Sequence, residues 1–142
     1  MKELALAGLL ALGTVAVAKA ETHHIALHVN QNDAQVMNMA LNNVVNLTNY
    51  YKDHGDDVVV EVVAYGPGLV MYIPGKSPVA DRIATMSLEM ENLSFSACGN
   101  TYAKMSAKAG HDIALLDEAK IVPSGVVRLI ELQERGFSYI RP

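Results

Sequence analysis

The sequence predicts an α/β domain in which helices cover a mostly parallel sheet of about five strands. Segments with the two-residue period of strands alternate with segments of helical period, and little linker separates them. Residues 57–66, DVVVEVVAYG, are nearly continuous in β-branched side chains, as in a strand covered on both faces. No unit of about 20–50 residues repeats, so one compact layered domain is expected.

The first twenty residues differ in composition from the rest of the chain. Lys2 precedes an apolar run over residues 4–18, and the segment ends in the small-x-small pattern Ala18-Lys19-Ala20. This layout is typical of a secretory signal peptide, and the run is shorter than the roughly 18 residues of a spanning helix. We predict a signal peptide at 1–20, with a second cleavage point after Ala18. The mature domain, 21–142, is expected to be periplasmic or secreted, without a stable membrane anchor.

Charge and motifs exclude several classes of function. The 142 residues include 11 Lys and Arg and 15 Asp and Glu, and the formal net charge is −4. No basic patch is evident, so nucleic acid is not expected as a partner. The sequence has no paired carboxylates, nucleophile triad or nucleotide-binding fingerprint. A self-sufficient hydrolase or dehydrogenase is therefore not expected, and no cofactor is predicted.

The first strand and the first helix have clear boundaries in the sequence. The strand is expected at residues 23–30, HHIALHVN, where alternate residues are apolar. Asn32, with Gln35 three residues later, predicts the cap of a helix over 33–54. Gly55 is expected to end this helix in a left-handed conformation.

Turn-forming residues divide the middle of the chain. Gly66-Pro67-Gly68 predicts a tight turn after the second strand, and a short apolar piece, LVMYI, leads to the breaker PGKSP. Ser77, followed by Pro78, predicts the start of a helix that runs to about Met90. The remaining expected elements are a strand at 92–97, a helix at about 100–108 ending at Gly110, a loop or short helix at 111–118, a strand at 119–122, a helix from Ser124 to Gly136 and a final strand at 137–142.

Cys98 is the one cysteine of the chain. It lies at the carboxyl end of a predicted strand and just before a predicted helix, where open parallel sheets bind their ligands. The N–H groups of a first helical turn favour a thiolate, and Gly99 would let a bound sulfur species approach the backbone. An exported chain with one cysteine cannot form an internal disulfide. Three interpretations are open: a reactive thiol, which we favour, a thiol paired with another molecule, or a buried and inert apolar side chain.

Two further strand-to-helix corners are candidates for the same pocket. Gly66-Pro67-Gly68 could line it with backbone amides and hold an anion, although a plain tight turn also explains these residues. Ser124-Gly125 follows the strand at 119–122, and a simple helix cap is the alternative there. Around Cys98 as the candidate catalytic residue, the candidate pocket residues are Asn30, Gly66, Pro67, Gly68, Gly99, Asn100, Thr101, Ser124 and Gly125.

A single reactive thiol suits the transfer of sulfur between molecules. A sulfur carrier needs one nucleophilic thiolate that accepts a sulfane sulfur and later yields it to another thiol. It needs no second cysteine, because the acceptor supplies that thiol. A dithiol oxidoreductase would use a resolving partner, typically in Cys-x-x-Cys, and the sequence has none.

Several motifs resemble those of the DsrE/DsrF-like family of sulfur-oxidation proteins. They are HVN at 28–30, ALNN at 40–43, VEVVAYGPG at 60–68, FSACGNT at 95–101 and PSGVVRLIELQERGFSYIRP at 123–142. The match spans essentially all of the mature chain, in the family's order and spacing. The resemblance implies a three-layer α/β/α sandwich that often assembles into trimers or hexamers. It also implies, for the sulfur-relay members, a cysteine that carries sulfur as a persulfide, and Cys98 is the cysteine of the ACGNT motif.

We therefore expect a periplasmic sulfur-relay or sulfane-sulfur-binding protein that acts as a homo-oligomer. Its role would be like that of a sulfurtransferase, with a sulfur donor and an acceptor thiol protein as partners. The alternative is a non-catalytic module that binds a small ligand or Cu(II), or a structural oligomer with an inert cysteine.

The histidines raise a separate metal hypothesis. Cleavage after Ala20 would make His23 the third residue, where the terminal amine, two amide nitrogens and the imidazole surround Cu(II) in a square-planar set. His28 is expected either to reach the crevice or to form a hydrogen bond within the core. His54 is expected to interact with a helix dipole, and His111 to lie in a loop.

Four asparagines fall on one side of the first predicted helix, opposite its apolar stripe. Asparagine is a mediocre helix former, and a solvated face would usually carry Lys and Glu. This face is interpreted either as a subunit contact made through side-chain amides or as simple solvent exposure. The four residues are Asn38, Asn42, Asn46 and Asn49.

Overall fold

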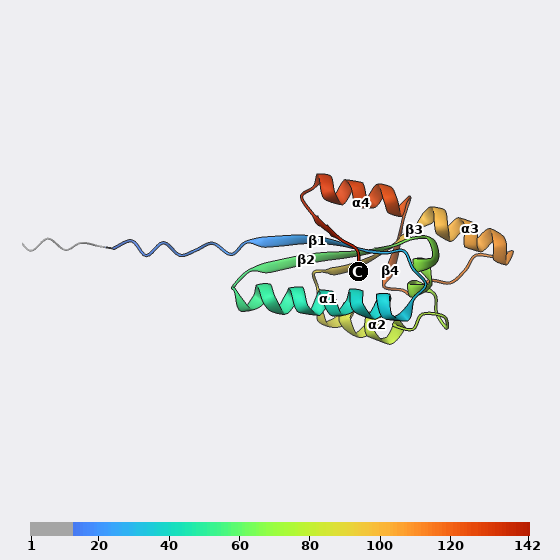
Figure 1. The fold of residues 1–142 in the computed structure, drawn as a ribbon, viewed down its shortest axis with the longest axis horizontal. Helices are drawn as coiled ribbons and strands as arrows, with labels where there is room; N and C mark the ends of the chain where they lie inside the picture. Colours follow the sequence, from blue (N-terminus) through green and yellow to red (C-terminus); the bar gives the residue numbers. More distant parts are fainter. Residues whose placement is uncertain (1–12) are drawn as a thin grey trace, which may run out of the picture.

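A computed structural model of the protein describes residues 13–142 and has an α/β fold with a five-stranded, all-parallel sheet (Figure 1). The elements are β1 (Thr22–Val29), α1 (Ala34–Asp53), β2 (Asp57–Ala64), the 3₁₀ helix η1 (Gly66–Tyr72), α2 (Ala80–Glu89), β3 (Leu93–Cys98), α3 (Gly99–Ala109), β4 (Ala119–Val122), α4 (Gly125–Glu134) and β5 (Ser138–Ile140). Helices α1 and α2 lie on one face of the sheet and α4 lies on the other, which confirms the predicted fold class.

The strand order β4-β3-β2-β1-β5 places β2 at the centre of the sheet. Val29, the last residue of β1, pairs with Ala64, and Ala64 pairs with Ala97 of β3. The three central strands therefore end at the same edge of the sheet. Tyr65, directly after β2, and Cys98, at the end of β3, are brought together at this carboxyl edge.

Both faces of the central strands are buried, as the β-branched run predicted. Val58, Val60 and Val62 belong to the larger core, which lies between the sheet and helices α1 and α2. Val63 points to the opposite face, where it packs with Leu129 in a smaller core under α4. A strand with apolar residues at nearly every position is needed because neither of its faces meets solvent.

Helix α1 begins one residue later than the sequence predicted. Asp33, not Asn32, is the N-cap, and its carboxylate accepts hydrogen bonds from the backbone N–H groups of Gln35 (2.7 Å) and Val36 (3.2 Å). Both residue types are good caps. The helical register, set by the side chains that α1 buries against the sheet, decides which one reaches the free N–H groups.

Helix α2 begins at Ala80 rather than at Ser77, so the prediction of a helix starting at Ser77 was wrong. The Ser77 hydroxyl accepts from the N–H of Val79 at 3.2 Å and thereby closes a local turn around Pro78. A serine side chain that bonds its own neighbourhood offers the backbone an alternative to the helix, and here the turn prevails.

Gly66-Pro67-Gly68 forms the first turn of η1 rather than an isolated tight turn, and most of the apolar piece LVMYI continues that helix. Gly66 has a left-handed φ of +56°, which turns the chain out of β2. The Tyr72 hydroxyl donates a hydrogen bond of 2.6 Å to the carbonyl of Val62 and holds η1 against the sheet.

The other boundaries follow the predictions closely. Gly55 and Gly110 end helices α1 and α3 with left-handed φ angles of +79° and +77°. Residues 111–118 form a loop, a strand occupies 119–122 as expected, and the final strand is shorter than predicted.

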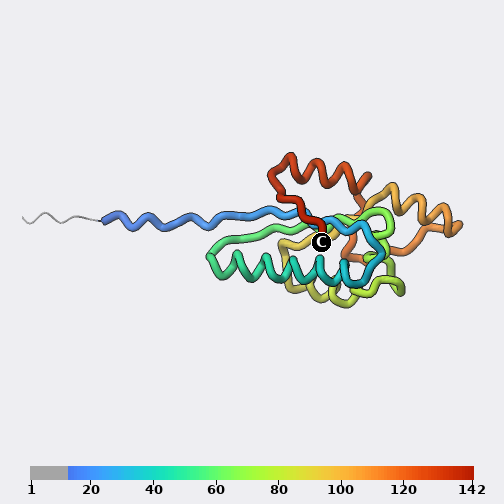
Figure 2. Tube along the Cα trace, viewed as in Figure 1, coloured from blue at the N-terminus to red at the C-terminus, as the bar shows by residue number. Residues whose placement is uncertain are grey.

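Residues 13–20, just before β1, lead away from the folded domain (Figure 2). Residues 13–20 are exposed and have no regular secondary structure. The predicted signal peptide also includes residues 1–12, which lie outside the described residues, so it stays a prediction. Over residues 13–142, no helix is both long and apolar enough to cross a membrane.

Candidate functional site

Cys98 lies where β3 passes directly into α3. It is the last residue of the strand and the N-cap of the helix, and its backbone is extended (φ −65°, ψ 117°). Its side chain faces the start of α4, because a Cβ built on Gly125 would lie 3.1 Å from the Cys98 Cβ. The residue is 5% exposed. The sequence therefore located this thiol correctly at a strand-to-helix corner, and the fold adds a second helix start beside it.

Hydrogen-bond donors near the Cys98 sulfur lower the pKa of its thiol. They are the backbone N–H groups of Gly125, Thr101 and Asn100 and the hydroxyl of Thr101. Burial is the largest single influence and raises the pKa of the thiol, since a buried charge loses its hydration. The donors favour the thiolate more strongly, and the pKa of Cys98 lies below its ordinary value. Two helix N-termini, those of α3 and α4, thus converge on one sulfur atom.

Thr101 connects this sulfur with the corner after β2. Its hydroxyl oxygen accepts a hydrogen bond of 2.8 Å from the backbone N–H of Gly66, which leaves the hydroxyl proton free to donate to the sulfur. The two corners are therefore neighbours, as the pocket hypothesis requires. The Gly66 N–H, however, donates its hydrogen bond to Thr101 and is therefore not available to bind an anion.

The glycines at these corners allow close approach within the chain itself. A Cβ on Gly99 would lie 2.8 Å from the carbonyl oxygen of Val122 and 3.1 Å from that of Pro123. A Cβ on Gly68 would lie 2.2 Å from the carbonyl oxygen of Val29. On the Cβ side of each residue the space is filled by backbone of the same chain, so packing, rather than room for a ligand, explains why these positions are glycine.

The remaining predicted pocket residues lie at the same edge of the sheet. Asn30 follows β1 and is half-buried, and Pro67 is exposed at the start of η1. Asn100 is exposed, and its backbone N–H is among the groups that lower the pKa of Cys98. Ser124 is the N-cap of α4, as the simpler interpretation proposed, but its side chain makes no capping hydrogen bond. The backbone of this edge, more than its side chains, contacts the sulfur.

Tyr65 is a part of the site that the sequence analysis did not identify. A Cβ on Gly125 would lie 2.9 Å from Tyr65 Cδ1, so the tyrosine and Cys98 flank the first residue of α4. The alternation of β2 could have indicated this position, because Tyr65 lies on the same face as Val63, which packs under α4. Two further residues that the sequence analysis missed, Glu61 and Arg128, bind each other behind this edge.

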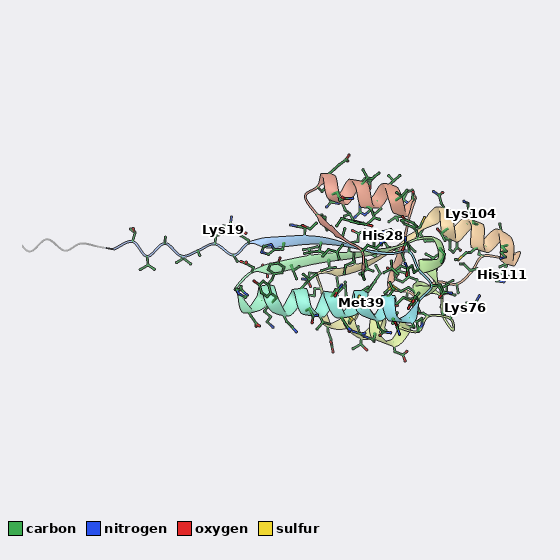
Figure 3. The ribbon with its side chains drawn as sticks, viewed as in Figure 1. Lys19, His28, Met39, Lys76, Lys104 and His111 are labelled. Atoms are coloured by element: carbon green, nitrogen blue, oxygen red, sulfur yellow. The ribbon has the colours of Figure 1, made fainter. Side chains whose placement is uncertain are left out.

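His28 lies beside Tyr65, near the carboxyl end of β1, whereas His111 lies at the far end of α3 (Figure 3). His28 is 3% exposed, and the centroid of its ring is 4.4 Å from that of the Tyr65 ring. Its Nδ1 is hydrogen-bonded to the Tyr139 hydroxyl at 2.7 Å, while its Nε2 is buried without a partner among the described residues. Burial, assisted by the positive charge of Arg141, lowers the pKa of this histidine.

His23 is held on another part of the sheet. Its ring stacks on Tyr51 with centroids 3.8 Å apart, and its Nε2 lies 3.2 Å from a carboxylate oxygen of Asp56. Within residues 13–142, no three His, Cys, Asp or Glu side chains are grouped to hold a metal ion. The copper hypothesis needs backbone nitrogens and a cleaved N-terminus, so it stays a prediction.

Two of the four asparagines on this face of α1 form hydrogen bonds with another helix of the same chain. The guanidinium of Arg82, on α2, donates to the side-chain oxygens of Asn38 (2.8 Å) and Asn42 (2.9 Å). Asn46 and Asn49 are exposed. The face therefore contributes to the α1–α2 contact, which neither of the two interpretations from the sequence had included.

Comparisons with known proteins support the fold. No family model matches the chain, and no curated protein matches it. Among solved structures, it is similar to MTH1491, a protein of unknown function from Methanobacterium thermoautotrophicum, with 26% sequence identity and a TM-score of 0.67. The similarity covers 84% of this chain and 99% of that one. The α/β layered architecture is thus shared with a protein whose own activity is unknown.

Proposed function

We propose that the protein binds sulfane sulfur on Cys98 as a persulfide and passes it to an acceptor thiol. The observation that carries this proposal is the position of Cys98 between the N-termini of α3 and α4, where the N–H groups of Gly125, Thr101 and Asn100 and the Thr101 hydroxyl lower the pKa of its thiol. Such an environment stabilises a thiolate, which is the nucleophile in sulfur transfer.

The transfer needs no group beyond the thiol and its two partners. The Cys98 thiolate attacks the outer sulfur of a donor persulfide, R–S–SH, and a new S–S bond forms at Cys98. The donor's S–S bond breaks, and its electron pair leaves with the donor thiolate, R–S⁻. In the second step an acceptor thiolate attacks the outer sulfur of Cys98–S–SH, and the Cys98 thiolate is released. The same donors that stabilise the thiolate favour this release, because Cys98 is then the leaving group.

The chain contains one cysteine, which fits a carrier and not a dithiol oxidoreductase. The resemblance to the DsrE/DsrF-like family supports the same role, since Cys98 is the cysteine of the ACGNT motif. Export to the periplasm and assembly into a homo-oligomer, which the sequence and the resemblance imply, are parts of this proposal. Intact mass of the exported product and light scattering of the purified protein measure these two properties.

The proposal is tested by treating the purified protein with inorganic polysulfide and measuring its intact mass. We expect an addition of about 32 Da that a thiol reductant removes, because the persulfide is a reversible modification. Cys98→Ser is the matched control: it leaves the chain without a thiol, so it should gain no sulfur.

Two outcomes would refute the carrier. One is a Cys98 that reacts with iodoacetamide in the folded protein yet gains no sulfur from polysulfide. The other is a Cys98 that reacts with neither reagent until the protein is unfolded, which would identify it as the inert buried thiol of the alternative interpretation.

A further inference from the structure

Behind the sulfur lies a buried ion pair that the transfer chemistry does not use. Glu61 of β2 is 6% exposed, and its two carboxylate oxygens accept hydrogen bonds of 2.7 Å each from Nε and Nη2 of Arg128 on α4. The hydroxyl of Ser96, on β3, donates to the same carboxylate at 2.6 Å. We call these three residues the Glu61 cluster.

Stability alone is a weak explanation for the Glu61 cluster. Removing two charges from water costs free energy that their attraction often only offsets, and apolar residues of similar volume frequently serve as well. A bidentate arginine–carboxylate pair, however, fixes direction as well as distance, because the planar guanidinium fits the two oxygens in one geometry. The pair therefore constrains where α4 sits on the sheet.

The constrained part of α4 is the turn that contacts Cys98. Arg128 follows Gly125 by three residues, and its own N–H donates to the carbonyl of Ser124 at 2.9 Å, closing the first turn of the helix. Ser96, at the other end of the cluster, precedes Cys98 by two residues on β3, so the two side chains point to the same face. The Glu61 cluster therefore connects to Cys98 in two ways: through the first turn of α4, which contains Gly125, and through β3, which contains both Ser96 and Cys98.

We infer that Arg128 is a positioning residue for Cys98: its two hydrogen bonds to Glu61 hold the first turn of α4 so that the Gly125 N–H faces the sulfur. The inference rests on the proposed function for its relevance to sulfur transfer. The placement of the amide itself is measurable without any sulfur donor.

The test measures the rate at which iodoacetamide alkylates Cys98 as a function of pH in the full chain. The main variant is Glu61→Gln combined with Arg128→Met, which removes both charges together and leaves no buried charge unpaired. The net charge stays the same, so a shifted midpoint reports the lost placement of the amide. We expect the midpoint to move to higher pH and the rate at about pH 7 to fall about threefold to tenfold.

Arg128→Lys keeps the positive charge but cannot make the two parallel hydrogen bonds of the guanidinium to Glu61. We expect it to shift the midpoint of the pH–rate curve in the same direction. Glu131→Gln is the matched control: Glu131 also contacts Arg128, at 3.6 Å, but it is 53% exposed and does not join α4 to the sheet. It should leave the midpoint unchanged. Circular dichroism of each variant verifies that the fold is retained.

A folded double variant with the midpoint of the original protein would overturn the inference. So would a Glu131→Gln midpoint shifted as far as that of the double variant, because the effect would then follow surface charge. If polysulfide adds no sulfur to Cys98 but the double variant shifts the midpoint, the proposed function fails while the positioning role of Arg128 stands.

Discussion

At the Cys98 sulfur, burial and hydrogen bonding act in opposite directions. Burial favours the neutral thiol, whereas the donors from Gly125, Thr101 and Asn100 favour the thiolate, and the donors prevail. Thr101 is the one side chain among these donors. Its hydroxyl oxygen accepts a hydrogen bond from the Gly66 N–H, and the same hydroxyl lowers the pKa of Cys98, so replacing the hydroxyl with a methyl group removes both contributions.

We predict that Thr101→Val raises the pKa of Cys98, because the sulfur loses a donor that favours its charged form. The rate of alkylation at about pH 7 should fall about threefold to tenfold, since a smaller fraction of the thiol is ionised. Thr101→Ser keeps the hydroxyl and should retain the original midpoint. The pH dependence of the thiolate's ultraviolet absorbance measures both variants, and equal midpoints for Val and Thr would contradict the assignment.

Close contacts between backbone segments decide how the elements meet at the carboxyl edge. η1 crosses the end of β1 so closely that Gly68 has no room for a side chain. Similarly, α3 begins against the end of β4 at Gly99, and α4 begins against Cys98 and Tyr65 at Gly125. Each of these glycines joins segments that are distant in the sequence, and together they bring three corners to one site.

We expect Gly68→Ala to destabilise the fold by about 3 kcal/mol, because the added Cβ would overlap the Val29 carbonyl and η1 would have to move. Gly75→Ala is the matched control. Gly75 has a left-handed φ of +76° but open space around its Cβ position, so only a backbone strain of about 1 kcal/mol is expected. Urea unfolding of both variants measures the difference, and equal losses would refute the packing explanation.

Over the whole molecule, the central strands of the sheet are buried on both faces, and the polar groups within and beside the sheet determine how stability depends on pH. His28 is buried with a lowered pKa, whereas the carboxylates of Glu61 and Asp56 also have lowered pKa values and titrate in a more acidic range. The first loss of stability on acidification is therefore assigned to the histidine.

We predict that the free energy of unfolding falls as the pH decreases from about 7.5 to about 5.5. Below its ordinary pKa of 6.5, His28 binds a proton in the unfolded chain more readily than in the folded protein, so the stability present above that pH is progressively lost. Each unit of difference between the two pKa values contributes about 1.4 kcal/mol.

His28→Gln retains a hydrogen-bonding side chain for Tyr139 but does not titrate in this range, so its stability should change less over the same interval. Urea unfolding at the two pH values compares the variant with the original protein. An identical pH dependence in both would show that another group is responsible.

Much of the fold could be predicted because its causes are local. Periodicity located all five strands and the four α-helices, but not η1, and turn-forming glycines located the ends of α1 and α3. The exact helix starts could not be predicted in the same way. At Asn32 and Asp33 two neighbouring side chains were able to cap, and packing against the sheet selected between them. Ser77 instead closes a local turn, and α2 begins at Ala80 without a side-chain cap.

Local sequence was enough to place Cys98 at the end of a strand and before a helix, because the residues directly before it have strand periodicity and those directly after it have helical periodicity. It could not show that Gly125 and Thr101 would meet at the sulfur, or that Glu61 and Arg128, 67 residues apart, would pair behind it. The alternation of a strand reveals which face a residue occupies but not which segment covers that face. Strand order and the path of α4 across the sheet decided those contacts, and they are properties of the folded chain alone.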